Sequence, residues 1–229
     1  MNSKKPIKAI VWDLDGTLIH FKIDSIKARK AAISVLISHG IDKANLSIQK
    51  SILDNVNISK QIFQQRGHDP NQISKILQEI DIKVSKIEYE AALNATMIKG
   101  IEDVLIFAQN NNLKQGIFTF NKYKHATLSL EKVKLKKYFD VIIGRDNVSN
   151  PKPHPDHLLV ICDKFGVKPN EILVIGDNYR DIEGAINVGA HSFAVHTKLA
   201  IVETLQKADV IVRESEIPQK LITEIKKLL

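Results

Sequence analysis

The chain has 229 residues, of which 44% are hydrophobic and 26% are charged, and its formal net charge is +7. This composition is typical of a folded globular protein and excludes a disordered chain, while the length allows one domain with a large insertion or two small domains. Its 33 basic residues are almost all lysines spread along the chain, without an arginine-rich arm, which argues against a nucleic-acid-binding protein.

The hydropathy pattern of the sequence shows neither a membrane-spanning segment nor a signal peptide. The longest apolar runs, such as Ile172–Ile175, are far shorter than a membrane span, and the N-terminal residues lead into a predicted strand without the apolar core of a signal peptide. We therefore expect a cytoplasmic protein that does not enter a membrane. The single cysteine, Cys162, has no partner for an internal disulfide, and its place in an apolar helical pattern predicts core packing.

The first predicted strand is the apolar run Ala9–Trp12, and two aspartates follow it directly, Asp13 and Asp15, with Gly16 behind them. In an open parallel α/β sheet, ligands bind beyond the carboxyl ends of the strands. The acidic pair therefore marks a candidate site. Taken alone, the same residues are equally compatible with an ordinary turn, because Asp and Gly favour turns.

The next segment, residues 19–97, contains no convincing strand and repeats apolar residues at helical spacing. The first such set is Ile26, Ala28, Ala31, Ala32, Val35 and Leu36. Gly40 is predicted to stop this helix, and Gly67–Pro70 is a predicted turn into the next one, with Asp69 or Asn71 as its N-cap. We expect a helical insertion here, placed as a cap domain, with residues 1–18 and 98–229 forming the core.

From Gly100 onward, short β-rich runs alternate with amphipathic stretches, which predicts a doubly wound parallel sheet with helices on both faces. The predicted strands are Gln115–Phe120, Val141–Gly144, Ile172–Gly176, His191–Val195 and Ala208–Val212. The predicted helices are Glu102–Asn110, Lys124–Val133, Pro155–Phe165, Asp181–Val188 and Pro218–Leu228. The fold class is therefore α/β, with a Rossmann-like core and an inserted helical domain.

Three further polar residues lie near predicted strand ends or helix starts. Asp177 and Asp181 follow the strand at Ile172–Gly176, and Lys152 precedes a predicted helix. A single loop lysine is most often solvated, so Lys152 gains weight only together with the aspartates. His154 and His157 lack an acidic or cysteine companion at zinc-site spacing, and we interpret both as helix-surface or capping residues.

These residue types suit phosphoryl transfer. A carboxylate that attacks phosphorus needs its own charge offset by a cation and a lysine, and we assign Asp13 as the nucleophile. In an extended strand end, Asp15 points to the same side as Asp13, so it is placed to protonate the leaving oxygen and later to activate water. Mg²⁺ prefers oxygen ligands, and Asp13 with Asp177 forms a plausible set, with Asp181 as a further ligand or as a partner of metal-bound water.

The chain resembles the haloacid dehalogenase superfamily in four motifs, which follow one another along the chain in the order found in that superfamily. They are Asp13–Thr17, Thr119 after a strand, Lys152, and Gly176 to Asp181. The segment between the first two motifs is similar to the helical cap of the phosphoglycolate phosphatase and β-phosphoglucomutase-like branch.

The resemblance implies several roles that the residues alone do not establish. Thr119 and the amides near Phe120 and Asn121 are expected to bind phosphate, together with Lys152, and the backbone carbonyl of Asp15 is expected to complete the Mg²⁺ shell. Thr119 on its own is more typical of a strand residue. An aspartate at position 15 favours a phosphatase or phosphomutase over a dehalogenase, a phosphonoacetaldehyde hydrolase or a P-type ATPase.

The leading hypothesis is therefore a Mg²⁺-dependent phosphatase that acts on a small phosphorylated metabolite through an aspartyl-phosphate on Asp13. Two alternatives stay open: a phosphomutase of the same fold, and a non-catalytic regulatory or interaction protein. His20, Lys22, Lys27 and Arg29 are candidates for contacts with the leaving group, although exposed lysines serve solubility more often than recognition.

Overall fold

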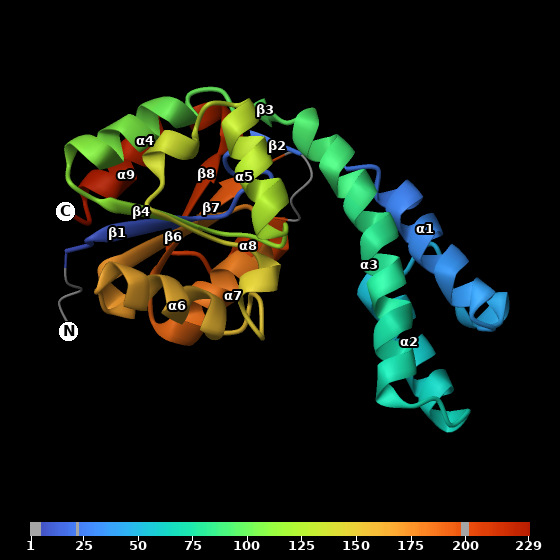
Figure 1. The fold of residues 1–229 in the computed structure, drawn as a ribbon. Helices are drawn as coiled ribbons and strands as arrows, with labels where there is room; N and C mark the ends of the chain where they lie inside the picture. The colour runs from blue at the N-terminus through green and yellow to red at the C-terminus, as the bar shows by residue number, and fades with distance from the viewer. Residues whose placement is uncertain (1–5, 22, 198–201) are drawn as a thin grey trace. The chain divides into compact units, whose positions relative to one another are not determined.

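The computed structural model describes residues 6–21, 23–197 and 202–229. It contains two compact units, residues 1–21 with 92–229, and residues 22–91. The first unit is an α/β core that the chain enters twice, and the second is helical (Figure 1).

Within the described residues, six parallel strands form the sheet of the core in the order β5-β4-β1-β6-β7-β8. Their bounds are β1 Ala9–Trp12, β4 Lys114–Phe118, β5 Val141–Ile143, β6 Ile172–Gly176, β7 His191–His196 and β8 Val210–Arg213. Trp12 is in register with Ile117 of β4 and with Ile175 of β6. The carboxyl ends of the three central strands therefore lie at one edge, and the predicted doubly wound parallel sheet is confirmed.

Helices cover both faces of this sheet, with α4 and α9 above it and α6 and α7 below it in the view of Figure 1. Their bounds are α4 Ile101–Asn110, α5 Tyr123–Lys132, α6 Asp156–Phe165, α7 Tyr179–Val188, α8 Val202–Leu205 and α9 Gln219–Lys226. Short 3₁₀ turns lie at Lys136–Tyr138, Arg145–Asn147, Pro169–Glu171 and Glu214–Glu216. The positions of the helices and strands agree with those expected from the sequence to within a few residues. The short helix α8 was not among the predicted helices.

Strand β1 is buried on both sides because alternate residues belong to different cores. Ile10 and Trp12 pack with α4, α5 and α9, whereas Ala9 and Val11 pack with α6 and α7. Each large apolar side chain removed from water contributes about 1.5–3 kcal/mol. Two such layers hold the central strand, and with it the residues that follow Trp12, in a fixed position.

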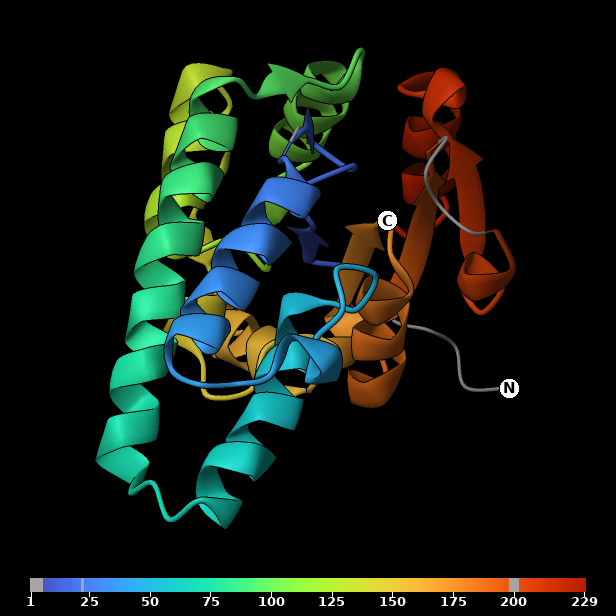
Figure 2. The ribbon, with the colours of Figure 1, turned by 90° about the vertical axis from the view of Figure 1, so that its right-hand side faces the viewer.

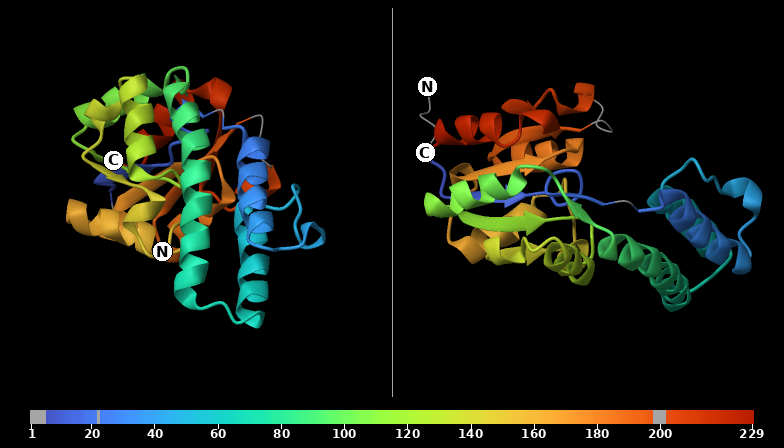
Figure 3. Two further views of the ribbon diagram at one scale, coloured as in Figure 1. Left: turned by 45° about the vertical axis from the view of Figure 1, so that its right-hand side comes forward. Right: turned by 90° about the horizontal axis from the view of Figure 1, so that it is seen from above.

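The helical unit has an apolar core of its own. It contains α1 Ser25–Ser38, α2 Ile52–Gln65, most of α3 Pro70–Leu93, and a 3₁₀ turn at Lys43–Asn45. Figures 2 and 3 show α2 and α3 running in opposite directions and the connection between α1 and α2 looping out beside them. The buried side chains of this core all come from the unit itself: Ala28, Ala32, Val35, Leu36, Ile41, Val56, Phe63, Ile73, Ile76, Ile80, Val84 and Ile87.

In the helical unit, one residue predicted to be on an apolar face is exposed, and one predicted N-cap is present. Ile26 is 55% exposed, so it is not part of the apolar face of α1. The predicted N-cap at Asp69 is confirmed, because its Oδ1 accepts hydrogen bonds from the amides of Asn71 and Gln72.

The segment 19–97, expected to contain no strand, begins and ends in one. β2 Ile19–His20 pairs antiparallel with β3 Thr96–Met97, so the chain leaves the core and returns to it side by side. A two-residue strand carries too little periodicity to be detected from sequence. Among the described residues, no helix is both long enough and apolar enough to cross a membrane.

Candidate active site

Asp13 follows the last residue of β1 and is anchored there by its backbone, because its amide donates to the carbonyl of Ile175 on the neighbouring β6. The chain then turns sharply at Gly16, whose φ is +81°. A Cβ atom at this position would lie 2.0 Å from Oδ2 of Asp177. Only glycine therefore allows the first acidic loop and the Asp177 carboxylate to approach each other this closely.

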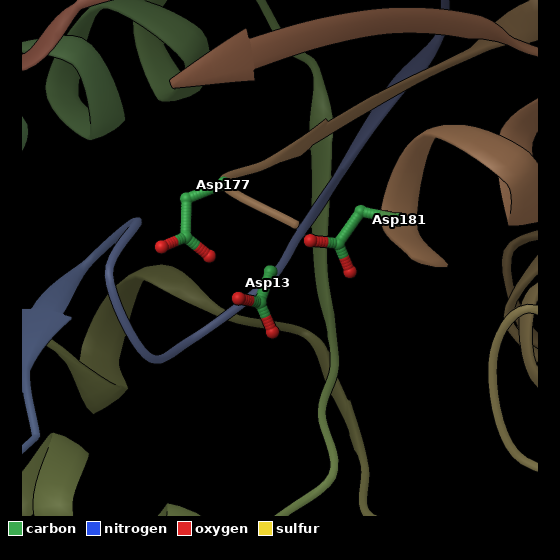
Figure 4. Close-up of side chains that lie close together, drawn as sticks. All are labelled: Asp13, Asp177 and Asp181. Carbon is green, nitrogen blue, oxygen red and sulfur yellow. The ribbon is translucent and has the colours of Figure 1, made fainter. Parts of the chain in front are cut away.

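Asp13, Asp177 and Asp181 point toward one another at the carboxyl edge of the sheet (Figure 4). One carboxylate oxygen from each residue lies within 4.8 Å of the other two. Asp181 is held by the start of α7, where its Oδ2 accepts a hydrogen bond of 3.0 Å from the amide of Asn178 in a capping box. Residues that are far apart in the chain thus form one acidic cluster.

The Lys152 ammonium lies inside this cluster and is 4% exposed as a residue. It forms ion pairs with Asp13 and, at 2.7 Å, with Oδ1 of Asp181, and it donates a hydrogen bond of 3.2 Å to the carbonyl of Phe118. Its Nζ also lies 4.3 Å from the centre of the Phe118 ring. Lys152 is therefore not a solvated loop lysine, and it lies beside the aspartates with which it was grouped from the sequence.

Burial dominates the electrostatics of the acidic cluster. It raises the pKa of Asp13 to about 7, with Lys152 opposing the shift and Asp181 adding to it. Burial and the neighbouring carboxylates of Asp13 and Asp181 raise the pKa of Asp177 to about 8. Burial lowers the pKa of Lys152, but the charges of Asp13 and Asp181 outweigh it, and the net shift is upward. Lys152 therefore stays charged at neutral pH.

This donor set fits Mg²⁺. Three carboxylates face one ammonium, so the ionised cluster has an excess of negative charge that burial makes costly. The converging donors are all oxygens, which are the ligands that Mg²⁺ prefers. Mg²⁺ usually binds only one or two protein carboxylates and keeps several waters besides a substrate phosphate. A divalent cation would stabilise the ionised forms that the metal-free cluster disfavours.

The Asp15 side chain is held by Asn121, whose Nδ2 donates to Oδ1 at 3.1 Å and to Oδ2 at 3.0 Å. Asn121 is buried, and its backbone amide donates to Oγ1 of Thr119. From the sequence, only the backbone amide of Asn121 was expected to take part in the site, as a phosphate ligand. Its side-chain contact with Asp15 spans 106 positions in the chain, and no local pattern signals it.

Thr119 and Phe120 lie at the end of β4, next to β1. Thr119 is fully buried, and its amide donates to the carbonyl of Ile143. Phe120 is 37% exposed as a residue, and the centre of its ring lies 5.6 Å from Nζ of Lys152. All the residues that were predicted to bind phosphate thus lie around the same edge of the sheet as Asp13.

The interpretation of His157 as a surface or capping residue is wrong. His157 is fully buried on the first turn of α6, its Nδ1 accepts a hydrogen bond from the amide of Lys152, and its Nε2 lies 3.0 Å from the carbonyl of Ile143. A signal existed, because His157, Ile161 and Phe165 recur at helical spacing on the buried face of α6. His154 does face solvent, and its Nδ1 accepts from the amide of Asp156.

Four residues were suggested as contacts for the leaving group of the substrate, and three of them have partners within their own unit. His20 lies 3.4 Å from Glu214, Lys27 pairs with Glu90 at 2.9 Å, and Arg29 donates to the carbonyl of Ile48. Lys22 lies outside the described residues. These contacts give the three side chains structural roles within their own units.

Comparisons with known proteins agree with the fold and with the motifs. A family model described as haloacid dehalogenase-like hydrolase matches residues 10–195. The phosphoglycolate phosphatase of Shigella dysenteriae is 26% identical over 211 residues, which cover 84% of this chain and 82% of that protein.

Solved structures with a similar fold include the β-phosphoglucomutase of Clostridium difficile. It has 22% identity and a TM-score of 0.67, and the match covers 96% of this chain and 97% of that one. A hydrolase from Pseudomonas syringae has 22% identity and a TM-score of 0.65, with 96% and 98% covered. At this level of identity the structural matches establish the fold.

Proposed function

The chain belongs to the haloacid dehalogenase-like hydrolase family, and from this premise we propose that it is a Mg²⁺-dependent phosphatase. It hydrolyses a small phosphorylated metabolite through an aspartyl-phosphate on Asp13. The observation that carries the proposal is the buried cluster of Asp13, Lys152 and Asp181, with Asp177 beside it. The phosphatase relatives at about a quarter identity support the reaction class.

In the first step, the Asp13 carboxylate attacks phosphorus. Lys152, which is ion-paired with Asp13 and Asp181, offsets the negative charge of the nucleophile and of the incoming phosphate. The burial of this ammonium strengthens its effect, because the interaction takes place away from bulk water. Thr119 and the backbone near Phe120 and Asn121 hold the phosphoryl oxygens.

Asp15 moves the protons. It protonates the leaving oxygen in the first step and then, as a carboxylate, takes a proton from the water that hydrolyses the aspartyl-phosphate. Asn121 contacts both oxygens of Asp15 and so fixes the plane of its carboxyl group. A fixed plane matters because the donor must lie within hydrogen-bond reach of the leaving oxygen.

Asp13 and Asp177 are the residues that would hold Mg²⁺, with Asp181 beside them. The family resemblance implies that the backbone carbonyl of Asp15 would complete the protein ligands. The ion supplies charge neutralisation at the phosphoryl oxygens when bound. The Asp181 side chain, which already contacts Lys152 and the amide of Asn178, orients the lysine and the water around this site.

The remaining assignments concern the helical segment and the surroundings of the protein. The helical unit within residues 19–97 serves as the cap that selects the leaving group, and the α/β unit carries the chemistry. The lysines are spread along the chain, which does not favour a nucleic acid as the partner. The positive net charge suits a small anionic metabolite as the substrate. We place the reaction in the cytoplasm.

A phosphatase screen tests the proposal. Purified protein is incubated with p-nitrophenyl phosphate, 2-phosphoglycolate, sugar phosphates and nucleotides, with Mg²⁺ or with EDTA, and inorganic phosphate is measured. We expect release that requires Mg²⁺ and at least one preferred metabolite. Formation of an isomeric phosphate without free phosphate would indicate a mutase instead, and no turnover of any compound would contradict the enzyme assignment.

A further inference from the structure

His157 is bonded at both ring nitrogens in the interior of the core. Its Nδ1 accepts from the amide of Lys152 at 3.1 Å, and its Nε2 lies 3.0 Å from the carbonyl of Ile143. A backbone amide only donates and a carbonyl only accepts, so Nδ1 carries no proton and Nε2 carries one. The two contacts therefore select one neutral tautomer.

These contacts connect His157 to the residues that meet the phosphate. The carbonyl of Ile143 accepts from His157 and also from the amide of Thr119, at 3.1 Å. The imidazole packs edge-on against Phe118, with ring centres 5.6 Å apart. The Lys152 ammonium donates to the carbonyl of Phe118 and lies over the ring of the same residue. One side chain thus braces the backbone of Lys152 and the strand ends beside it.

The electrostatic setting is consistent with a neutral ring. Burial lowers the pKa of His157 to about 4, the bond to Ile143 opposes the shift, and the Lys152 charge adds to it. At neutral pH the imidazole brings no positive charge next to the lysine and keeps its acceptor nitrogen for the lysine amide.

We propose that His157 is a positioning residue for Lys152, acting through the bond from the Lys152 amide to its Nδ1 while touching no substrate. The proposal rests on the proposed phosphatase function for its kinetic consequence. A lysine side chain has four rotatable bonds, so a loosened backbone shifts its ammonium relative to the phosphoryl group. A displacement of about 1 Å in a catalytic group costs on the order of 100-fold in rate.

Three variants separate this role from simple packing. In His157→Asn, the side-chain oxygen takes the place of Nδ1 and keeps the bond from the Lys152 amide. In His157→Gln, the side-chain NH₂ takes the place of Nε2 and keeps only the bond to Ile143. His157→Leu keeps neither. Asn and Gln each lose one hydrogen bond, so they form a matched pair for stability.

With p-nitrophenyl phosphate and Mg²⁺, we expect kcat to fall by less than about 10-fold in His157→Asn and by about 100-fold in His157→Gln and His157→Leu, with KM changed by less than about threefold. Thermal midpoints of the Asn and Gln variants should be similar. His154→Asn, at an exposed position just before α6, is the control and should match the wild type. Equal kcat in the Asn and Gln variants, or losses that follow the thermal midpoints, would overturn the proposal.

A second readout does not depend on turnover. In ¹⁵N-labelled protein at pH 7, the ring nitrogens of His157 should show a proton on Nε2 and none on Nδ1. The Lys152 amide should exchange slowly in the wild type and in His157→Asn, and faster in His157→Gln. A proton on Nδ1, or equal exchange in both variants, would overturn the positioning role even in a protein without phosphatase activity. Absent turnover with these signatures intact would instead overturn the proposed function.

Discussion

The proposed role of Asp15 as a general acid depends on the leaving group of the substrate. A general acid matters most when the leaving oxygen is a poor leaving group, and matters little when that group departs readily as an anion. Its carboxyl group is half-buried, and both of its oxygens accept hydrogen bonds from Asn121, which orients the group. The expected signature is therefore a dependence of the mutant's defect on the leaving group.

We predict that Asp15→Asn lowers kcat for an alkyl phosphate by about 100-fold or more and lowers kcat for p-nitrophenyl phosphate much less. Steady-state rates with both compounds measure the ratio. Asp163→Asn, on the exposed face of α6, is the control and should change neither rate. An equal loss with both compounds would remove Asp15 from the role of acid.

The raised pKa values of Asp13, about 7, and Asp177, about 8, predict that Mg²⁺ binding competes with protons. In the metal-free protein, these two carboxyl groups bind protons more tightly in the folded state than in the unfolded state. Their contribution to stability is therefore present at pH below the ordinary value of 3.8 and is lost as the pH rises through about 7 to 8. Mg²⁺ requires the ionised forms, so its affinity should rise over the same range.

Calorimetric titration with Mg²⁺ at several pH values, in two buffers of different ionisation enthalpy, measures both affinity and proton release. We expect tighter binding at higher pH and net release of protons near neutral pH. Asp177→Asn should weaken binding and reduce the release. Binding that is independent of pH, with no proton release, would contradict the assignment of these carboxylates as the ligands.

At the scale of elements, the turn that follows β1 is set by one glycine. Gly16 has a left-handed φ of +81°, and Gly189, at the end of α7, has one of +74°. A Cβ atom on Gly16 meets Asp177 at 2.0 Å, whereas one on Gly189 meets nothing within 4 Å. A Cβ atom would be strained by the left-handed φ at both positions, but only at Gly16 would it also collide with a neighbouring side chain.

We predict that Gly189→Ala costs about 1 kcal/mol in the free energy of unfolding and that Gly16→Ala costs at least about 2 kcal/mol. Gly16→Ala should also weaken Mg²⁺ binding, because Asp177 must move. Chemical denaturation and metal titration measure the two effects. Equal costs at the two positions, with Mg²⁺ binding unchanged, would show that the close approach has no energetic weight.

The sequence predicts the elements of the core well because strands and helices alternate with clear periodicity, and the acidic residues stand next to the apolar runs that form β1 and β6. It does not predict contacts between distant segments, such as Asn121 with Asp15. His157 was assigned a surface or capping role because it has no acidic or cysteine companion at zinc-site spacing. The lack of a metal site does not bear on burial, and the helical spacing of His157, Ile161 and Phe165 was the signal for the inner face of α6.

At the scale of the whole molecule, the two units have separate hydrophobic cores. The core cluster of the helical unit contains only residues of that unit, and the clusters around the sheet draw their buried residues from outside it. The chain leaves and re-enters the α/β unit through the β2–β3 pair, where His20 faces Thr96 and Ile19 faces Met97. A short turn can therefore close this pair, and each unit has the core that independent folding requires.

We predict that replacing residues 22–94 by Asn-Gly leaves an α/β unit that unfolds cooperatively and binds Mg²⁺ with an affinity close to that of the full chain. Discrimination among phosphorylated metabolites should be lost, because the proposed cap is gone. Thermal unfolding, calorimetry and the substrate screen measure these properties. An unfolded product, or unchanged selectivity, would contradict the division of labour between the units.

The central claim is that Asp13 becomes phosphorylated during turnover. The most direct measurement is mass spectrometry of protein quenched in acid within the first turnover with Mg²⁺ and an active substrate. We predict a phosphate adduct on the peptide that contains Asp13, removed by hydroxylamine and missing in Asp13→Asn, whose kcat should fall by about 1,000-fold or more. Full activity of Asp13→Asn, or an adduct on another residue, would contradict the account.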